Sequence, residues 1–264
     1  MTTTLILTDY LEDKLIDHIF RNVTYTSPGL NIWLGLFTAS PGEGGGGTEM
    51  SGGTYARVQV NAWDVPASGH TQNTNIIAWP TATTVQGTVA AVGIFDAETN
   101  GNLLMWGADE VLTNDIDPGD VYSIAAGLLD ISLTGNYGYY LANALLSHIL
   151  RNSAYSKPTD IKIHLYSTLP NAADSGGVEL SGGAYAAISV FGATDWDDHG
   201  DGTTENTNLE VYATATADWS EAVGACLRDQ SGNLLFVKTL DSPITIYNGD
   251  LFRWPVGSFD VAIR

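Results

Sequence analysis

"HIFRN" occupies residues 18–22 and "HILRN" occupies residues 148–152, so the chain repeats one five-residue phrase 130 positions later. Each phrase closes a stretch whose apolar residues recur every three or four positions, which is the spacing of a helix buried along one face. The first stripe contains Leu11, Leu15, Ile16, Ile19 and Phe20. The second stripe contains Leu141, Leu145, Leu146, Ile149 and Leu150. We therefore predict two amphipathic helices, the first of them opened by a capping box between Asp9 and Glu12.

The repetition extends far beyond the two helices. Three further pairs of phrases match in order: "EMSGGTYA" (49–56) with "ELSGGAYA" (179–186), "NGNLLMW" (100–106) with "SGNLLFV" (231–237), and "IDPGD" (116–120) with "IYNGD" (246–250). Ordered matches at a nearly constant offset indicate a tandem duplication. The sequence predicts two similar modules, residues 1–135 and residues 136–264, the second being a diverged repeat of the first.

After each predicted helix the pattern changes to that of β-structure. Short apolar runs rich in valine, isoleucine, threonine and aromatic residues alternate with glycine and asparagine turns. Many short strands without intervening helices are typical of antiparallel sandwiches. We predict a mainly β protein with minor α content: two tandem antiparallel β-sandwich modules, jelly-roll-like, each opened by one amphipathic helix.

Composition and charge exclude several classes of protein. The chain has 264 residues, with 10 basic and 30 acidic side chains and a formal net charge of −20. Nucleic acids and anionic membranes are bound through clustered lysine and arginine, so we expect neither partner. No apolar run is long enough to cross a bilayer, and the start of the chain does not resemble a signal peptide. The single cysteine, Cys226, lies in an apolar stretch that predicts an inert buried thiol.

The repeated histidines, His18 and His148, could belong to a metal site, a catalytic pair or a duplicated structural unit. Neither copy has a second histidine, cysteine or carboxylate one turn later on the same face, which argues against a metal pair on the helix. We predict neutral histidines hydrogen-bonded to the main chain. Arg21 and Arg151, at the ends of the helices, are expected to cap carbonyl groups or to pair with a carboxylate.

One loop, "ATDWDDHGDGTTENTN" (193–208), has the residue types of a cation site. Its five acidic residues could supply oxygen ligands to Ca²⁺, and they are Asp195, Asp197, Asp198, Asp201 and Glu205. Their spacing is not that of an EF-hand, and the first module has only Asp64 in the matching loop. A solvated acidic loop without a cation, or catalytic carboxylates, are the alternatives; we identify no catalytic residue and no cofactor other than this possible Ca²⁺.

Six motifs follow one another along the chain: "HIFRN", "LGLFT", "GTEMSGGTYARV", "WPTATT", "VGIFDAETNGNLLMWG" and "PGDVYSIAAGLLDISL". In this order they resemble a family of phage tail-fibre or minor tail proteins. They span nearly all of the first module, whereas the second replaces "GIFDA" by "ACLRD" and "YAR" by "YAA". The resemblance implies a non-enzymatic structural protein of a tailed-phage virion, made in the host cytoplasm: a tail-fibre tip or adaptor, with possible adhesion to the host surface.

Two alternatives stay open beside this function. One is a capsid decoration or cement protein, and the other is a carbohydrate-binding module with a Ca²⁺ loop. The second would need exposed aromatic residues, but four tryptophans in or beside strand patterns are expected in the core: Trp33, Trp63, Trp79 and Trp106. The expected partners are other virion proteins, further copies of the chain in a homo-oligomer with a trimer favoured, and a glycan or protein on the host surface.

Overall fold

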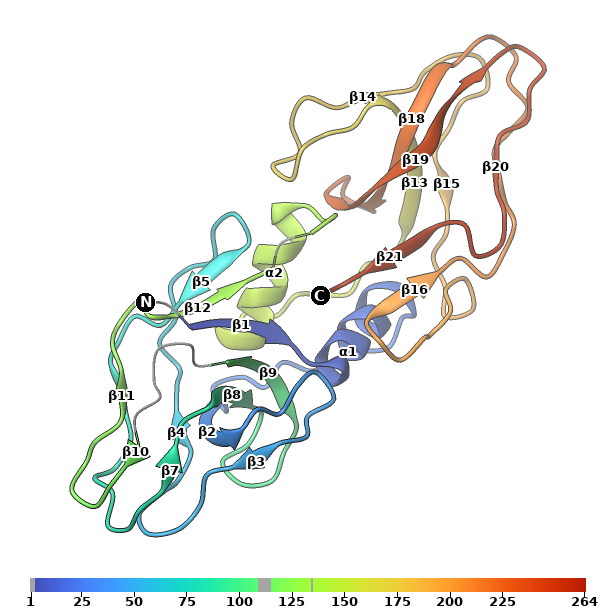
Figure 1. Cartoon of the computed structure of the whole chain (residues 1–264). Coiled ribbons are helices and arrows are strands. Elements are labelled where there is room, and N and C mark those ends of the chain that lie inside the picture. Colours follow the sequence, from blue (N-terminus) through green and yellow to red (C-terminus); the bar gives the residue numbers. More distant parts are fainter. Residues whose placement is uncertain (1–2, 109–114, 134) are drawn as a thin grey trace.

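The computed structural model describes residues 3–108, 115–133 and 135–264, and each of its two halves contains one helix followed by a series of strands (Figure 1). The first half contains β1 (Thr3–Leu7), α1 (Asp9–Phe20), β2 (Trp33–Ala39), β3 (Thr48–Glu49), β4 (Val58–Gln59), β5 (His70–Gln72), β6 (Ile77–Ala78), β7 (Gly87–Thr88), β8 (Ala91–Phe95), β9 (Leu103–Ala108), β10 (Asp115–Ile116), β11 (Ser123–Ile124) and β12 (Leu129–Ser132). The second half contains α2 (Tyr139–Leu150), β13 (Ile161–Thr168), β14 (Val178–Glu179), β15 (Ile188–Ser189), β16 (Thr203–Glu205), β17 (Glu210–Val211), β18 (Ser220–Asp229), β19 (Leu234–Ile246), β20 (Arg253–Trp254) and β21 (Asp260–Ala262).

Both predicted helices form where the apolar stripes place them. All ten residues of the two stripes are buried. The start of α1 differs from the prediction, because the residue that caps it is Thr8 and not Asp9. The Thr8 hydroxyl accepts a hydrogen bond from the Leu11 main chain at 3.4 Å, and it also donates one to the Leu103 carbonyl at 2.7 Å. Thr8 therefore both caps the helix and fixes it to strand β9.

The strand pairings are repeated from one half to the other. In the first half the sheet order is β3-β2-β8-β9-β1-β12-β5, with β4 also pairing with β2. The second half repeats the first four places as β14-β13-β18-β19, with β15 also pairing with β13. Two further pairs also match: β16 with β21 corresponds to β5 with β12, and β17 with β20 corresponds to β6 with β11. The same order of strands in both halves confirms the tandem duplication.

The mainly β architecture with one helix near the start of each half is confirmed, but two finer features differ. Strand β1 precedes α1, so the first half opens with a strand. In addition, β1 runs parallel to β12, which makes that sheet mixed and not purely antiparallel. This pairing joins the two ends of the repeat, so its direction cannot be inferred from local patterns. The jelly-roll-like sandwich stays a prediction.

The two halves share one continuous core, and the helices lie in its centre (Figure 1). Helix α1 packs against β9 of its own half and against β16 of the other half. Helix α2 repeats the arrangement with β19 and β5. Each helix thus covers its own sheet on one side and the partner half on the other. This reciprocal packing brings the two copies of the opening phrase together.

Candidate functional site

His18 and His148 lie face to face where the two helices meet. Their ring centroids are 5.4 Å apart, and the ring planes differ by 15°. Within each half, the ring Nδ1 accepts a hydrogen bond from the main chain seven residues later, from Tyr25 at 3.1 Å and from Tyr155 at 3.0 Å. The ring Nε2 reaches across to the other half, from His18 to the Tyr155 carbonyl at 2.9 Å and from His148 to the Tyr25 carbonyl at 3.1 Å.

These four hydrogen bonds fix the chemical state of both imidazoles. An Nδ1 atom that accepts from a main-chain N–H is unprotonated, so the proton lies on Nε2 and is donated to the opposite carbonyl. Burial is the main cause that lowers the pKa of His18 and of His148 below the usual value. Because both ring nitrogens are engaged, neither histidine offers a free lone pair to a metal ion. The predicted hydrogen bonds to the main chain are confirmed, and two of the four join the halves, which the sequence did not indicate.

The arginines of the opening phrase also cross between the halves. Arg21 pairs with Asp17 one turn earlier in α1 at 2.9 Å and with Asp198 in the acidic loop of the second half at 2.5 Å. Arg151 donates to the carbonyl of Trp63 in the matching loop of the first half. Each arginine therefore fixes a helix end to the loop of the other half, by a carboxylate in one copy and by a carbonyl in the other.

The acidic loop directs four of its five carboxylates toward donors of the protein. The Asp197 side chain accepts from the Asp198 main chain at 2.8 Å. The Asp195 side chain accepts from an asparagine amide at 3.0 Å, and that of Asp201 accepts from a threonine main chain at 3.2 Å. The carboxylate of Asp198 is the one bound by Arg21. The amide that binds Asp195 belongs to Asn208, and the main-chain N–H that binds Asp201 belongs to Thr203. Five acidic residues that are neighbours in sequence are thus not gathered around one point.

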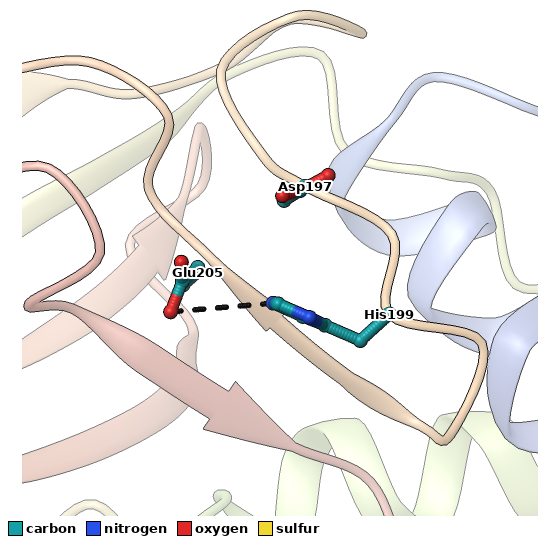
Figure 2. A group of neighbouring side chains, drawn as sticks. All are labelled: Asp197, His199 and Glu205. Atoms are coloured by element: carbon teal, nitrogen blue, oxygen red, sulfur yellow. Dashed lines mark ion pairs between the residues drawn. The ribbon is translucent and has the colours of Figure 1, made fainter.

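Two of the five carboxylates approach a histidine that the sequence interpretation had not singled out. Asp197, His199 and Glu205 each offer a ligand atom within 4.8 Å of the others, and Figure 2 shows them on the loop and on strand β16. The His199 Nε2 lies 4.0 Å from a Glu205 carboxylate oxygen. One imidazole with two carboxylates suits a transition metal such as zinc better than Ca²⁺, which prefers six or more oxygen ligands. The Ca²⁺ site itself stays a prediction.

The first half has a different pair at the same place. Asp64 and Gln72 match Asp197 and Glu205. In each half the main-chain N–H of the aspartate donates to the carbonyl of the second residue of the same pair, at 2.9 Å in the first half and at 3.0 Å in the second. The Gln72 amide also donates to the Asp64 carboxylate at 2.9 Å. In the second half this amide is replaced by a carboxylate, so the two side chains repel each other unless a proton or a cation lies between them.

Glu12 is a buried acidic residue, to which the sequence interpretation gave a role in helix capping. It lies on α1 and is 5% exposed, where the other half places Ala142. Burial, followed by the negative charges of Glu43 and Asp9, raises the pKa of Glu12 to about 7. The carboxylate faces Gly202, where a Cβ atom would come within 2.3 Å of a Glu12 oxygen. The helical pattern gave no signal of this burial, since the covering strand comes from the opposite half.

The outer face of each sheet has an arginine against an aromatic ring, but the arginine stands at a different position in each half. In the first half the guanidinium of Arg57 lies 3.3 Å from the centre of the Phe95 ring. In the second half Arg228 takes the position of Phe95, and its Nε donates to the Tyr166 hydroxyl at 2.8 Å. Arg57 is correspondingly replaced by Ala187. The two sequence differences, "ACLRD" and "YAA", thus compensate each other.

The four tryptophans expected in the core divide into two pairs. Trp63 and Trp79 are buried, at 4% exposure each, as predicted. Trp33 and Trp106 are only partly buried and pack against the smaller apolar cluster around Phe95. The expectation was therefore wrong for these two, because they lie on the outer face of a sheet whose inner face covers the core.

The comparisons with known proteins agree with the duplication. The sequence model of a family described as Podophage GP4 fiber I protein gp80 matches residues 6–132 and again residues 136–262. The search of curated proteins gave no significant match. In the part of the chain that the structure describes, no helix is long and apolar enough to span a membrane. The two matched segments together cover nearly the whole chain, which therefore belongs to the podophage GP4 fibre I protein family and carries two tandem copies of its module.

Proposed function

We propose that this fibre-family protein is a non-enzymatic tip or adaptor of the podophage fibre, built from modules 1–135 and 136–264. The observation that carries the proposal is the use of the repeated residues. The histidines and arginines of both copies bind the opposite half, and membership of the fibre family makes the chain a virion component. The fibre family also favours the tail over the capsid decoration that the sequence left open.

A role in assembly accounts for the charge better than catalysis does. Within the described residues, the carboxylates of Asp195, Asp198 and Asp201 accept hydrogen bonds from asparagine, arginine and threonine, and the two buried histidines use both ring nitrogens. A net charge of −20 keeps separate copies apart at low ionic strength. Specific association with other copies or other virion proteins must overcome this repulsion, and salt screens it.

We infer that the chain forms a cyclic homo-oligomer, with a trimer favoured, since closed rotational symmetry is the rule for such assemblies. Light scattering of the purified chain at low and at moderate salt tests this. Association should increase with salt, because the acidic repulsion is screened. A chain that stays monomeric at high concentration in both buffers, and also with purified virion proteins added, would contradict the proposal.

A second role, cation-dependent adhesion to a host-surface glycan, is supported by two observations. Asp197, His199 and Glu205 converge in the acidic loop, and Trp33 and Trp106 are partly exposed on the outer sheet face. These two features lie in different halves, so they do not form a single sugar site within one module. Glycan-array binding that is lost with EDTA would favour this role over assembly alone.

A further inference from the structure

Among the described residues, the second half has no counterpart of strand β1, which completes the sheet of the first half. In the first half β1 lies between β9 and β12, with Ile6 and Leu7 antiparallel to β9 and with Thr3–Leu5 parallel to β12. In the second half the corresponding strands, β19 and β21, belong to separate sheets (Figure 1). Among the described residues, no strand pairs with both.

The reason is the short connection between the halves. Leu133 is still hydrogen-bonded to Gly69 of the first half at 2.8 Å, whereas Tyr137 already forms a bridge with Phe236 of the second half. The segment that matches β1 therefore reaches β19 only with its last residues. Its Gly135 stands at the position of Leu5, whose side chain is fully buried in the first half. An apolar side chain is thus missing from the second half at this place.

A cavity of 410 Å³ occupies the vacant position. It lies between the start of β19, strand β21 and residues 135–137. At β21, the main-chain groups of Phe259 and Ile263 form hydrogen bonds on the side where β16 lies. Successive residues of a strand direct their main-chain groups to opposite edges, so those of Asp260 and Ala262 face the cavity. The first half has the same arrangement. The main-chain groups of Leu129 and Leu133 form hydrogen bonds on the β5 side of β12, and β1 pairs with the opposite edge of β12.

The cavity continues along the free edge of β19. A second cavity, of 600 Å³, shares Lys238, Thr239 and Asp260 with the first and extends to Ile244 and Trp254. Because the two cavities share these residues, they form one groove. The ammonium group of Lys238 and the carboxylate of Asp260 form an ion pair across it. Main-chain edges on two sides and a vacancy at the place of the Leu5 side chain are the features that an added strand needs.

We propose that this groove binds an extended segment of a neighbouring virion polypeptide, which adds to the free edge of β21 as Thr3–Leu5 adds to β12. The occupant has an apolar residue at the position of Leu5 and carries no net negative charge, because the chain itself is strongly acidic. The inference rests on the proposed role in assembly and names the kind of contact that assembly uses.

The added strand is not the β1 strand of a second copy of the chain, because each copy has fewer β1 strands than positions for them. Each copy contains two such positions but only one β1, and this β1 already fills the position in its own first half. A copy that donated β1 to a neighbour would open its own sheet and bury no additional edge. The occupant is therefore a segment of a different polypeptide.

A peptide with the sequence of residues 2–8, TTTLILT, flanked by a lysine at each end, is the probe for this site. The full-length chain is titrated into the fluorescein-labelled peptide, and hydrogen exchange is measured with and without saturating unlabelled peptide. We expect saturable 1:1 binding and slower exchange in residues 236–240 and 259–263. A peptide with aspartate in place of the leucine that matches Leu5 is the control and should not bind.

Two variants of the groove should change peptide binding in opposite directions. Ala262→Pro removes a main-chain donor on the free edge and should weaken binding about five- to tenfold, the equivalent of one hydrogen bond of about 1 kcal/mol. Lys238→Gly should bind the peptide more tightly. In the first half this position is Gly107, where a Cβ atom would lie 2.3 Å from the Thr4 carbonyl oxygen, so β1 passes where a side chain would stand.

The outcomes separate the strand site from the proposed function. No saturable binding to either the wild type or Lys238→Gly overturns the site, while association measured by light scattering would leave the role in assembly standing. Faster exchange in residues 103–108 would mean that the peptide displaces β1 from the first half, which also overturns the site. Peptide-induced growth of oligomers would identify strand exchange between copies and overturn the choice of a different polypeptide.

Discussion

Replacing His18 by alanine tests how the two halves are held together. The substitution leaves two main-chain groups without their partner, the N–H of Tyr25 and the carbonyl of Tyr155, in a place where His18 is only 2% exposed. An unpaired buried polar group costs about 1–3 kcal/mol, so the free energy of unfolding should fall by about 2–5 kcal/mol. That is a large part of the 5–15 kcal/mol typical of a folded domain.

Urea unfolding followed by tryptophan fluorescence measures this loss. His70→Ala is the matched control, because the His70 side chain is 51% exposed and should change stability by no more than about 0.5 kcal/mol. The variants His18→Ala, His148→Ala and their combination form a cycle. Since the two rings are stacked, their effects should couple by about 1 kcal/mol or more.

The pH dependence of the same variants gives an independent test. The pKa of each histidine is lower in the folded chain than its ordinary value of 6.5, so the folded state resists protonation. The stability associated with the pair is complete above pH 6.5 and is lost as the pH falls through the folded pKa. The wild type should therefore lose more stability than the double variant between pH 8 and pH 5.5. A His18→Ala variant as stable as the wild type, or one that has lost a stoichiometric metal ion, would refute the reasoning.

Three further changes follow from the contacts between the halves. Glu12→Gln should stabilise the chain at pH 8 by about 1–2 kcal/mol, after allowance for solvent screening. The folded pKa of about 7 lies above the ordinary 4.5, so ionisation of Glu12 costs stability as the pH rises. The stability gained by Glu12→Gln should therefore vanish below pH 4.5. The control Glu98→Gln, at an exposed position, should give no gain in stability at either pH. Arg151→Ala should cost about 1–3 kcal/mol, because it leaves the buried Trp63 carbonyl unpaired. Arg21→Ala, which breaks partly exposed ion pairs, should cost about 0.5–1 kcal/mol and less at high salt. If urea unfolding shows the same loss of stability for Arg21→Ala and Arg151→Ala, the expected difference between them is wrong. Calorimetric titration with Ca²⁺ and with Zn²⁺ should detect a cation at Asp197, His199 and Glu205 that Glu205→Gln abolishes, and binding unaffected by this change would place the cation elsewhere.

The duplication and the helices could be predicted from sequence because they depend on local patterns. The stripes of α1 and α2 are buried as the periodicity indicated, and the matched phrases lie on matched strands. The contacts between halves could not be predicted in this way. His18 bonds to a carbonyl 137 positions later, and nothing in the residues around Tyr155 indicates that its main chain is an acceptor.

The acidic loop shows the same limit at a smaller scale. Five acidic residues within eleven positions suggested a single cation site, but the direction of each side chain depends on the course of the loop. Arg21 of the other half attracts Asp198, and the turn at Thr203 binds Asp201. The residue that completes the remaining group, His199, was visible in the sequence, and its proximity to Glu205 depends on strand β16. Burial of Glu12 was hidden for the same reason, since Gly202 comes from the other half.

Gold-labelled antibodies against this chain, applied to purified virions and imaged by electron microscopy, test the central claim most directly. Labelling at the fibres of the tail, in a number of copies that follows the symmetry of the fibre, is the predicted result. Labelling distributed over the capsid, or virions that carry no label while the chain remains free in the lysate, would contradict a role as a fibre component.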